Sequence, residues 1–185
     1  MSAEKLVTRA KSRKSFGVWG ICLLGLILSG CGYTLVGQGS LPDHIETIAI
    51  PTFENETLEE GVEEIITRAV IDEYVSGGKM RLVAENEADA VLRGTIRSYS
   101  ADEAVTYNEL NEVSSYKLEV GIDAELEDRV NDEILWETEG LTEDADFDGG
   151  PDVDITTQQE NETEALQEVA EELAETIRAL STEGF

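Results

Sequence analysis

The sequence contains few of the residues that most often carry chemistry. It has one histidine and two cysteines, too few for a histidine-rich metal motif, and it contains no nucleophile elbow or phosphate loop. The histidine, His44, follows Asp43, but neighbouring side chains on an extended backbone point to opposite faces, so adjacency alone does not pair them. We interpret His44 as a solvated residue. Carboxylates are too abundant for any two to stand out as a dyad, so a hydrolase has no residues to support it. We predict no enzyme activity, no catalytic or metal-binding residues and no cofactor.

Basic residues are also scarce. The chain has 13 Lys and Arg against 41 Asp and Glu, which gives a formal net charge of −28. A field of this sign repels nucleic acid and anionic lipid surfaces, so neither is expected as a partner. Two explanations for the acid excess stay open: a salt-rich habitat, in which screening makes such a surface tolerable, or a polycation or divalent-ion partner. We favour the habitat, because the acids are spread along the whole chain.

The first 30 residues have a different composition from the rest. A basic segment is followed by the apolar run Phe16–Leu28, which has 13 residues, and then by Ser29, Gly30 and Cys31. Basic, apolar and small residues in this order are typical of a secretory signal. The apolar run is shorter than the roughly 20 residues that a permanent membrane helix needs. The basic residues are Lys5, Arg9, Lys11, Arg13 and Lys14.

The segment Leu28-Ser29-Gly30-Cys31 resembles a bacterial lipobox. The resemblance implies that the chain is cut before Cys31, that the thiol of Cys31 receives diacylglycerol, and that the new amine is acylated. Two or more acyl chains anchor a protein stably in a membrane. Gly32 stands where an aspartate would retain the protein in the inner membrane, which implies outer-membrane sorting with the domain facing the periplasm. The alternative is an ordinary secreted protein with a cysteine at this position.

Cleavage there would leave one domain over residues 31–185, with 31–43 as a tether. Cys22 would leave with the signal, so the domain would contain no disulfide and no thiolate metal site. A β-branched run at Ile45–Ile50, stopped by Pro51, predicts a first strand.

A helix is predicted to follow the first strand. Apolar residues recur at helical spacing between Val62 and Tyr74, after a T-x-x-E capping box at Thr57 and Glu60. Gly77-Gly78 is expected to end this helix. Leu82 and Val83 then read as a short edge strand or a loop.

Alternation of apolar and polar residues predicts three longer strands, at Ala90–Tyr99, Tyr116–Leu126 and Ile134–Leu141, with a turn at Asn131-Asp132. An amphipathic pattern from Ala165 to Leu180 predicts a terminal helix. Strict alternation implies that one face of the sheet is wet. The expected fold is therefore an α+β two-layer sandwich in the order β-α-β-β-β-α, with about four strands and both helices on one face.

These motifs resemble the LptE family of lipopolysaccharide-assembly lipoproteins. The matching segments are Cys31-Gly32-Tyr33, Leu41-Pro42, the strand Thr47–Ile50, the turn Pro51-Thr52-Phe53-Glu54-Asn55, and Ala88 to Gly94 at a strand start. The resemblance implies a non-enzymatic outer-membrane subunit. Such a subunit plugs an LptD-like β-barrel translocon, helps it to assemble, and contacts lipopolysaccharide. An alternative is a periplasmic activator or scaffold lipoprotein with a domain like those of TolB or curli secretion, which share the Pro-x-Phe-x-Asn turn.

Lipid A phosphates call for positive charge, which is scarce here. Arg93, Arg97 and Lys117 are expected on the wet sheet face, where we predict that they pair with Glu119, Asp123 and neighbouring acids. We therefore assign no lipopolysaccharide-binding residue.

The segment Asp144–Asp154 opens with the D-x-D-x-D-G pattern of a calcium loop. Position 12 would be Ile155 instead of glutamate, Pro151 interrupts the middle, and a strand instead of a helix precedes it. We predict a solvated acidic loop here, with calcium binding as the alternative.

Overall fold

The protein is described here by a computed structural model that covers residues 41–78 and 80–183. Its sheet contains three long strands, β4 (Ala90–Tyr107), β5 (Val113–Asp128) and β6 (Glu133–Asp148), which form an antiparallel meander. The short strands β1 (Thr47–Ala49), β2 (Glu54–Asn55) and β3 (Arg81–Leu82) run parallel to their partners along the remaining edge. The strand order is β3-β1-β4-β5-β6, and β2 pairs with β4 beyond β1.

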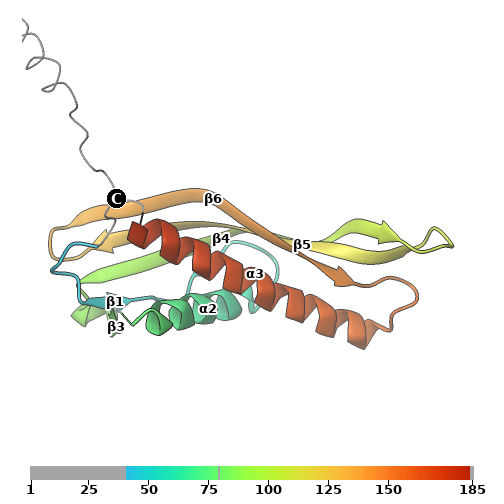
Figure 1. The fold of residues 1–185 in the computed structure, drawn as a ribbon, viewed down its shortest axis with the longest axis horizontal. Helices are drawn as coiled ribbons and strands as arrows, with labels where there is room; N and C mark the ends of the chain where they lie inside the picture. The colour runs from blue at the N-terminus through green and yellow to red at the C-terminus, as the bar shows by residue number, and fades with distance from the viewer. Residues whose placement is uncertain (1–40, 79, 184–185) are drawn as a thin grey trace, which may run out of the picture. The chain divides into compact units, whose positions relative to one another are not determined.

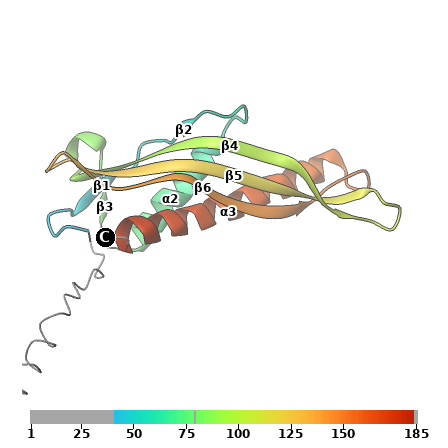
Figure 2. The same cartoon turned by 90° about the horizontal axis from the view of Figure 1, so that it is seen from above.

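Two helices, α2 (Val62–Ser76) and α3 (Ile155–Glu183), lie side by side on one face of this sheet (Figures 1 and 2). The predicted α+β sandwich is confirmed, although the two-residue strands β2 and β3 raise the strand count to six. Leu82 belongs to β3, the edge strand, while a 3-10 turn at Glu85–Glu87 leads into β4.

The core lies between the helices and the inward face of the sheet. Alternate residues of β5 from Leu118 to Leu126 are buried, as their sequence pattern predicts. They meet the apolar sides of both helices, of which Ile66 and Val70 in α2 and Leu173 and Ile177 in α3 have no exposed surface. The remaining face of the sheet is only partly covered, so the strands alternate between core and solvent.

Phe53 connects the first strand to the core. Its ring is 3% exposed and packs against Gly94 of β4, where an added Cβ atom would lie 2.2 to 2.6 Å from three ring atoms. The Phe53 backbone N–H donates to the Thr67 hydroxyl of α2 at 2.9 Å. Because Gly94 has no side chain, β4 leaves room at this position for the aromatic ring from the turn after Pro51.

The predicted capping box of α2 is wrong. Thr57 is held in the preceding turn, where its N–H and hydroxyl donate to Oδ1 of Asn55 at 2.9 and 2.7 Å. The helix begins after Gly61, which has a φ of 89° and no side-chain cap. Glu63, not Glu60, reaches back to accept the Gly61 N–H at 3.2 Å. The T-x-x-E pattern considers only Thr57 and Glu60, so it does not show that Asn55 offers the Thr57 hydroxyl another hydrogen-bond acceptor.

Three elements extend by seven or more residues beyond their predicted limits. β4 continues past Tyr99 to Tyr107, and β6 continues past Leu141 to Asp148. α3 begins at Ile155, about ten residues before its apolar pattern. The extensions of β4 and α3 contain no buried residue, so an apolar period gives no signal there, whereas the extension of β6 buries Ala145 and Phe147. The added part of β4 pairs with β5 through its backbone, with several register shifts.

Candidate functional site

Cys31, the predicted lipidation site, lies outside the described residues, as does the whole predicted signal of residues 1–30. The described part of the proposed tether includes Leu41, which packs against the core. Among the residues that the structure describes, none of the helices has both the length and the apolar character needed to cross a membrane.

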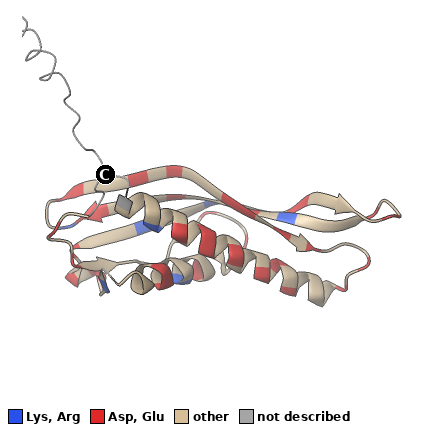
Figure 3. Cartoon of the chain, viewed as in Figure 1, with Lys and Arg blue, Asp and Glu red and all other residues tan. Residues whose placement is uncertain are grey.

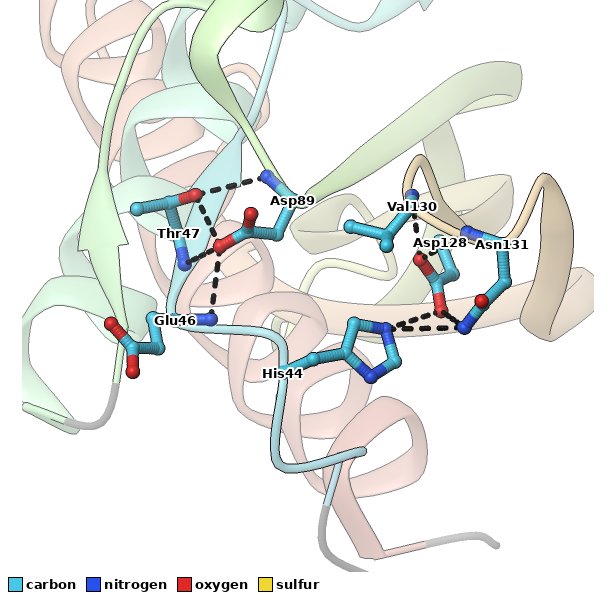
Figure 4. A network of polar contacts seen from close by, with 7 residues as sticks. All are labelled: His44, Glu46, Thr47, Asp89, Asp128, Val130 and Asn131. Atoms are coloured by element: carbon cyan, nitrogen blue, oxygen red, sulfur yellow. Dashed lines mark hydrogen bonds and ion pairs between the residues drawn. The ribbon is translucent and has the colours of Figure 1, made fainter.

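A polar network ties the segment before β1 to the turn between β5 and β6 (Figure 4). Nε2 of His44 lies 2.7 Å from Oδ2 of Asp128, which also accepts from the Asn131 side-chain amide at 2.9 Å. Oδ1 of Asp128 accepts the backbone N–H groups of Val130 and Asn131 at 2.8 and 3.1 Å. Asp128 has no exposed side-chain surface, whereas 36% of the His44 side chain is exposed. The expected exposure of His44 is confirmed, but its partner 84 residues away was not predicted.

The Asp128 carboxylate is a structural anion. Burial opposes its ionisation, but the N–H donors of Asn131 and Val130 and the His44 ring outweigh burial and hold the pKa of Asp128 below its ordinary value. Among the described residues, the His44 ring forms hydrogen bonds with the carboxylate of Asp128 and the side-chain amide of Asn131.

A second carboxylate in Figure 4 joins β1 to the start of β4. Oδ2 of Asp89 accepts the hydroxyl of Thr47 at 2.7 Å and the backbone N–H groups of Thr47 and Glu46 at 3.0 and 3.1 Å. The Asp89 N–H donates back to the Thr47 hydroxyl at 2.9 Å. The Thr47 hydroxyl and the Glu46 N–H lower the pKa of Asp89. The Ala-Asp-Ala motif at a strand start therefore fixes how two parallel strands begin.

The three cations predicted on the wet sheet face lie there, and each has an acidic partner. Nε of Arg97 lies 2.6 Å from Asp123, which confirms that predicted pair, and its Nη1 lies 2.5 Å from Glu56. Lys117 lies 3.4 Å from Asp144. Hydrogen bonds to these carboxylates raise the pKa of Arg97 and of Lys117. The predicted partner Glu119 takes no part in these pairs.

Arg93 completes the set. Its Nη2 lies 2.6 Å from Glu85, and the Glu85 hydrogen bond raises the pKa of Arg93. Arg93 and Arg97 line a shallow hollow of about 440 Å³ on this face, together with five carboxylates. Acids therefore outnumber cations at the hollow, and its charge opposes a phosphate ligand. The carboxylates are those of Glu54, Asp123, Glu125, Glu137 and Glu139.

The predicted acidic loop Asp144–Asp154 is a strand over its first part. Asp144, Asp146 and Asp148 lie on β6 and alternate with Ala145 and Phe147, which are buried in the core. Alternating strand side chains share a face without converging on one ion, which is not the geometry of a calcium loop. Within the described ranges, no group of three or more His, Cys, Asp or Glu side chains is placed to hold a metal ion.

The last residue of that segment caps a helix. Oδ1 of Asp154 accepts the N–H groups of Thr156 and Thr157 at 3.1 Å, and Oδ2 accepts the Thr157 hydroxyl at 2.6 Å. The Thr157 hydroxyl and N–H lower the pKa of Asp154. Asp154 therefore accepts two of the backbone N–H groups that the first turn of α3 leaves without an intrahelical partner.

Acidic side chains are distributed over the long strands and α3 without one dominant cluster (Figure 3). This agrees with their even spread along the sequence. The described residues thus bring together carboxylates and the backbone and hydroxyl donors that hold them in place.

Comparison with known proteins identifies the family. The family model described as lipopolysaccharide-assembly, LptE, matches residues 45–179. The chain belongs to the LptE family. Its members are non-enzymatic lipopolysaccharide-assembly lipoproteins, so the match favours this family over the TolB-like and curli-like alternatives considered from the sequence. None of the curated proteins matches the chain.

Solved structures resemble this LptE-family chain at low sequence identity. A minor lipoprotein from Acinetobacter baumannii is 18% identical, with a TM-score of 0.50 and coverage of 76% of this chain and 93% of that one. PelC from Paraburkholderia phytofirmans, a dodecamer, is 16% identical, with a TM-score of 0.49 and coverage of 78% and 93%. Rare lipoprotein B from Shewanella oneidensis is 14% identical, with a TM-score of 0.44 and coverage of 70% and 89%. The first of these likenesses supports the fold.

Proposed function

We propose that this protein is the outer-membrane lipoprotein subunit of a lipopolysaccharide translocon. The acylated Cys31 anchors it, and the domain that follows faces the periplasm and occupies an LptD-like β-barrel, which it helps to assemble. The family match over residues 45–179 carries this proposal. The lipobox pattern ending at Cys31, followed by Gly32, supports the outer membrane as the location.

The polar groups of the domain favour a role that depends on shape. Every buried side-chain nitrogen and oxygen of the described residues has a hydrogen-bond partner within the domain. Arg93, Arg97 and Lys117 are likewise engaged by carboxylates. A plug needs a rigid body whose buried polar groups are hydrogen-bonded internally, whereas recognition of lipid A phosphates needs cations that are free to bind them. We therefore assign no lipopolysaccharide contact to these three cations.

The anchor is tested by the change Cys31→Ser, with Cys22→Ser as a matched control inside the signal. Mass spectrometry of the purified proteins should find an acylated terminus at residue 31 in the parent and in the Cys22 variant, and none in the Cys31 variant. An acylated Cys31 variant, or a parent whose terminus lies elsewhere without acyl groups, contradicts the anchor.

The partner is tested by affinity purification from detergent-solubilised outer membrane. A large β-barrel protein should co-purify with the parent in about equal amount, since the proposal seats one plug in one barrel. A native complex without a transmembrane barrel contradicts the translocon role. Recovery of a stoichiometric periplasmic synthase instead would favour an activator lipoprotein.

A further inference from the structure

The hairpin formed by β4 and β5 displays large apolar side chains to solvent. It projects past the first turn of α3, at the end of the domain opposite to β1 (Figure 1). At its tip Val105 is 38% exposed, Tyr107 57% and Leu110 77%. Single exposed apolar residues are common on proteins, whereas a group of them on a projecting element is typical of a binding surface. We call Val105, Tyr107 and Leu110 the hairpin tip.

The turn that carries Leu110 is fixed by Asn108. Oδ1 of Asn108 accepts the backbone N–H groups of Leu110 and Glu112 at 3.0 and 2.9 Å, and its own N–H donates to the Glu112 carbonyl at 2.8 Å. Its side-chain amide donates to Asp152 at 2.9 Å, which ties the hairpin tip to the segment before α3. These bonds involve backbone groups and Asn108, so the turn does not need a leucine side chain. A surface that is already fixed in shape loses little entropy on binding.

The surroundings of the hairpin tip are acidic. Glu109, Glu112 and Asp152 are exposed, and none of them takes part in the ion pairs that the described residues form. Lys117, the nearest basic residue along the hairpin, is engaged by Asp144 at 3.4 Å. Apolar side chains among unneutralised carboxylates call for a partner surface that is apolar in the middle and basic at its rim.

We propose that Tyr107 and Leu110 dock into an apolar pocket of a partner protein whose rim carries Lys or Arg. The acids disfavour an anionic lipid surface, and a second copy of this chain would bring the same charges to the contact. The segment that leads to Cys31 joins the domain at Leu41, beside the last turn of α3. That helix has 29 residues, about 43 Å, so the hairpin tip lies far from the point where the tether begins. Both observations favour a protein over the membrane that holds the anchor.

The inference goes beyond the proposed function, because it names the residues and the chemistry of a contact that any protein partner would have to supply. Site-specific photocrosslinking tests it in the intact lipoprotein. The probe is p-benzoylphenylalanine at position 107, which retains the aromatic ring of Tyr107. Cells are irradiated, and the crosslinked peptide is identified by mass spectrometry.

Two changes are compared in this background. Leu110→Ser removes the most exposed side chain of the hairpin tip. Leu58→Ser is the matched control, since Leu58 is 102% exposed in the segment between β2 and α2. A second pair reverses one charge: Glu109→Lys at the hairpin tip, and Glu119→Lys at an exposed position of β5 farther along the sheet.

The crosslink should map to an apolar segment of one protein, with Lys or Arg next to it. Burial of one leucine corresponds to about tenfold or more in affinity, so Leu110→Ser should reduce the crosslinking yield at least about fivefold. Leu58→Ser should change the yield less than about twofold. Glu109→Lys should reduce the yield, and Glu119→Lys should not, because the rim charge acts at short range.

A crosslink to lipopolysaccharide or phospholipid would overturn the proposal, as would a crosslinked segment without apolar or basic residues. Equal yields for Leu110→Ser and Leu58→Ser, or for the two charge reversals, would overturn it as well. Circular dichroism of each variant checks that the fold persists. A parent protein that does not co-purify with a barrel would contradict the proposed function and not the docking of the hairpin tip.

Discussion

The contact between Phe53 and Gly94 can be tested by filling the glycine. Alanine at position 94 would place its Cβ 2.2 to 2.6 Å from three atoms of the Phe53 ring, and that ring is only 3% exposed. Overpacking of this kind costs about 1–3 kcal/mol. The lower entropy of the unfolded alanine chain offsets about 0.4–1 kcal/mol of that. We expect Gly94→Ala to lower the free energy of unfolding by about 1–2 kcal/mol.

The assay is urea denaturation followed by far-ultraviolet circular dichroism, with a second, matched glycine as control. At Gly77 an added Cβ would meet its nearest neighbours at 3.6 Å, which is ordinary contact, and φ is −64°. Gly77→Ala should therefore leave stability unchanged or raise it slightly. This comparison separates the clash at Gly94 from the general effect of replacing a glycine.

A double variant tests whether the ring is the cause. Phe53→Leu alone should destabilise the protein, because it leaves space beside Gly94. Combined with Gly94→Ala, it should cost at least about 1 kcal/mol less than the sum of the two single changes, since the smaller side chain makes room for the methyl group. Strict additivity, or a Gly94→Ala protein as stable as the parent, would refute this account of the turn.

Three further predictions concern buried and charged side chains. Tyr74→Phe removes the hydrogen bond to Ser181 and should lower the free energy of unfolding by about 0.5–1.5 kcal/mol. Burial raises the pKa of Tyr74 to about 12. The contribution of Tyr74 to the free energy of unfolding is therefore complete below the unfolded pKa of about 10 and is lost as pH rises through about 12. An alkaline titration by ultraviolet absorbance would follow the ionisation of Tyr74. The pKa of Asp89 is lowered in the folded protein. The contribution of Asp89 to the free energy of unfolding is therefore present above its unfolded pKa of about 3.9 and is lost as pH falls through its folded pKa. In urea melts at a series of acidic pH values, Asp89→Asn should reduce the loss of stability over this pH range. Asp154→Ala should speed hydrogen exchange in the first turn of α3, and an unchanged rate would show that the cap is not needed.

The predicted strands that proved accurate were those with a one-sided apolar period. Leu118 to Leu126 alternate because one face of β5 meets the helices, and this information is local. Ser100 to Tyr107 belong to β4 for a different reason, since their backbone pairs with β5, the other strand of the same hairpin. The alternation of Ala145 and Phe147 with aspartates was a readable strand signal, but a resemblance to a calcium loop obscured it.

The candidate site was less accessible to sequence reasoning than the fold. The Arg97–Asp123 pair followed from strand faces, because cross-strand neighbours can be inferred once two strands are placed. Asp128, the partner of His44, is the last residue of β5, and Glu85, the partner of Arg93, lies in a 3-10 turn. Both positions depend on how the surrounding strands begin and end. No periodic pattern marks such residues.

The sequence by itself determined the signal and lipobox pattern, the two-layer fold class and the motifs shared with the LptE family, because each depends on residues that are close together in the chain. Only the tertiary structure decided that Asp128 is a buried, fully hydrogen-bonded anion and that Glu85 is the partner of Arg93. The positions of these residues depend on how the surrounding strands and turns pack across the whole core, which no short stretch of sequence contains.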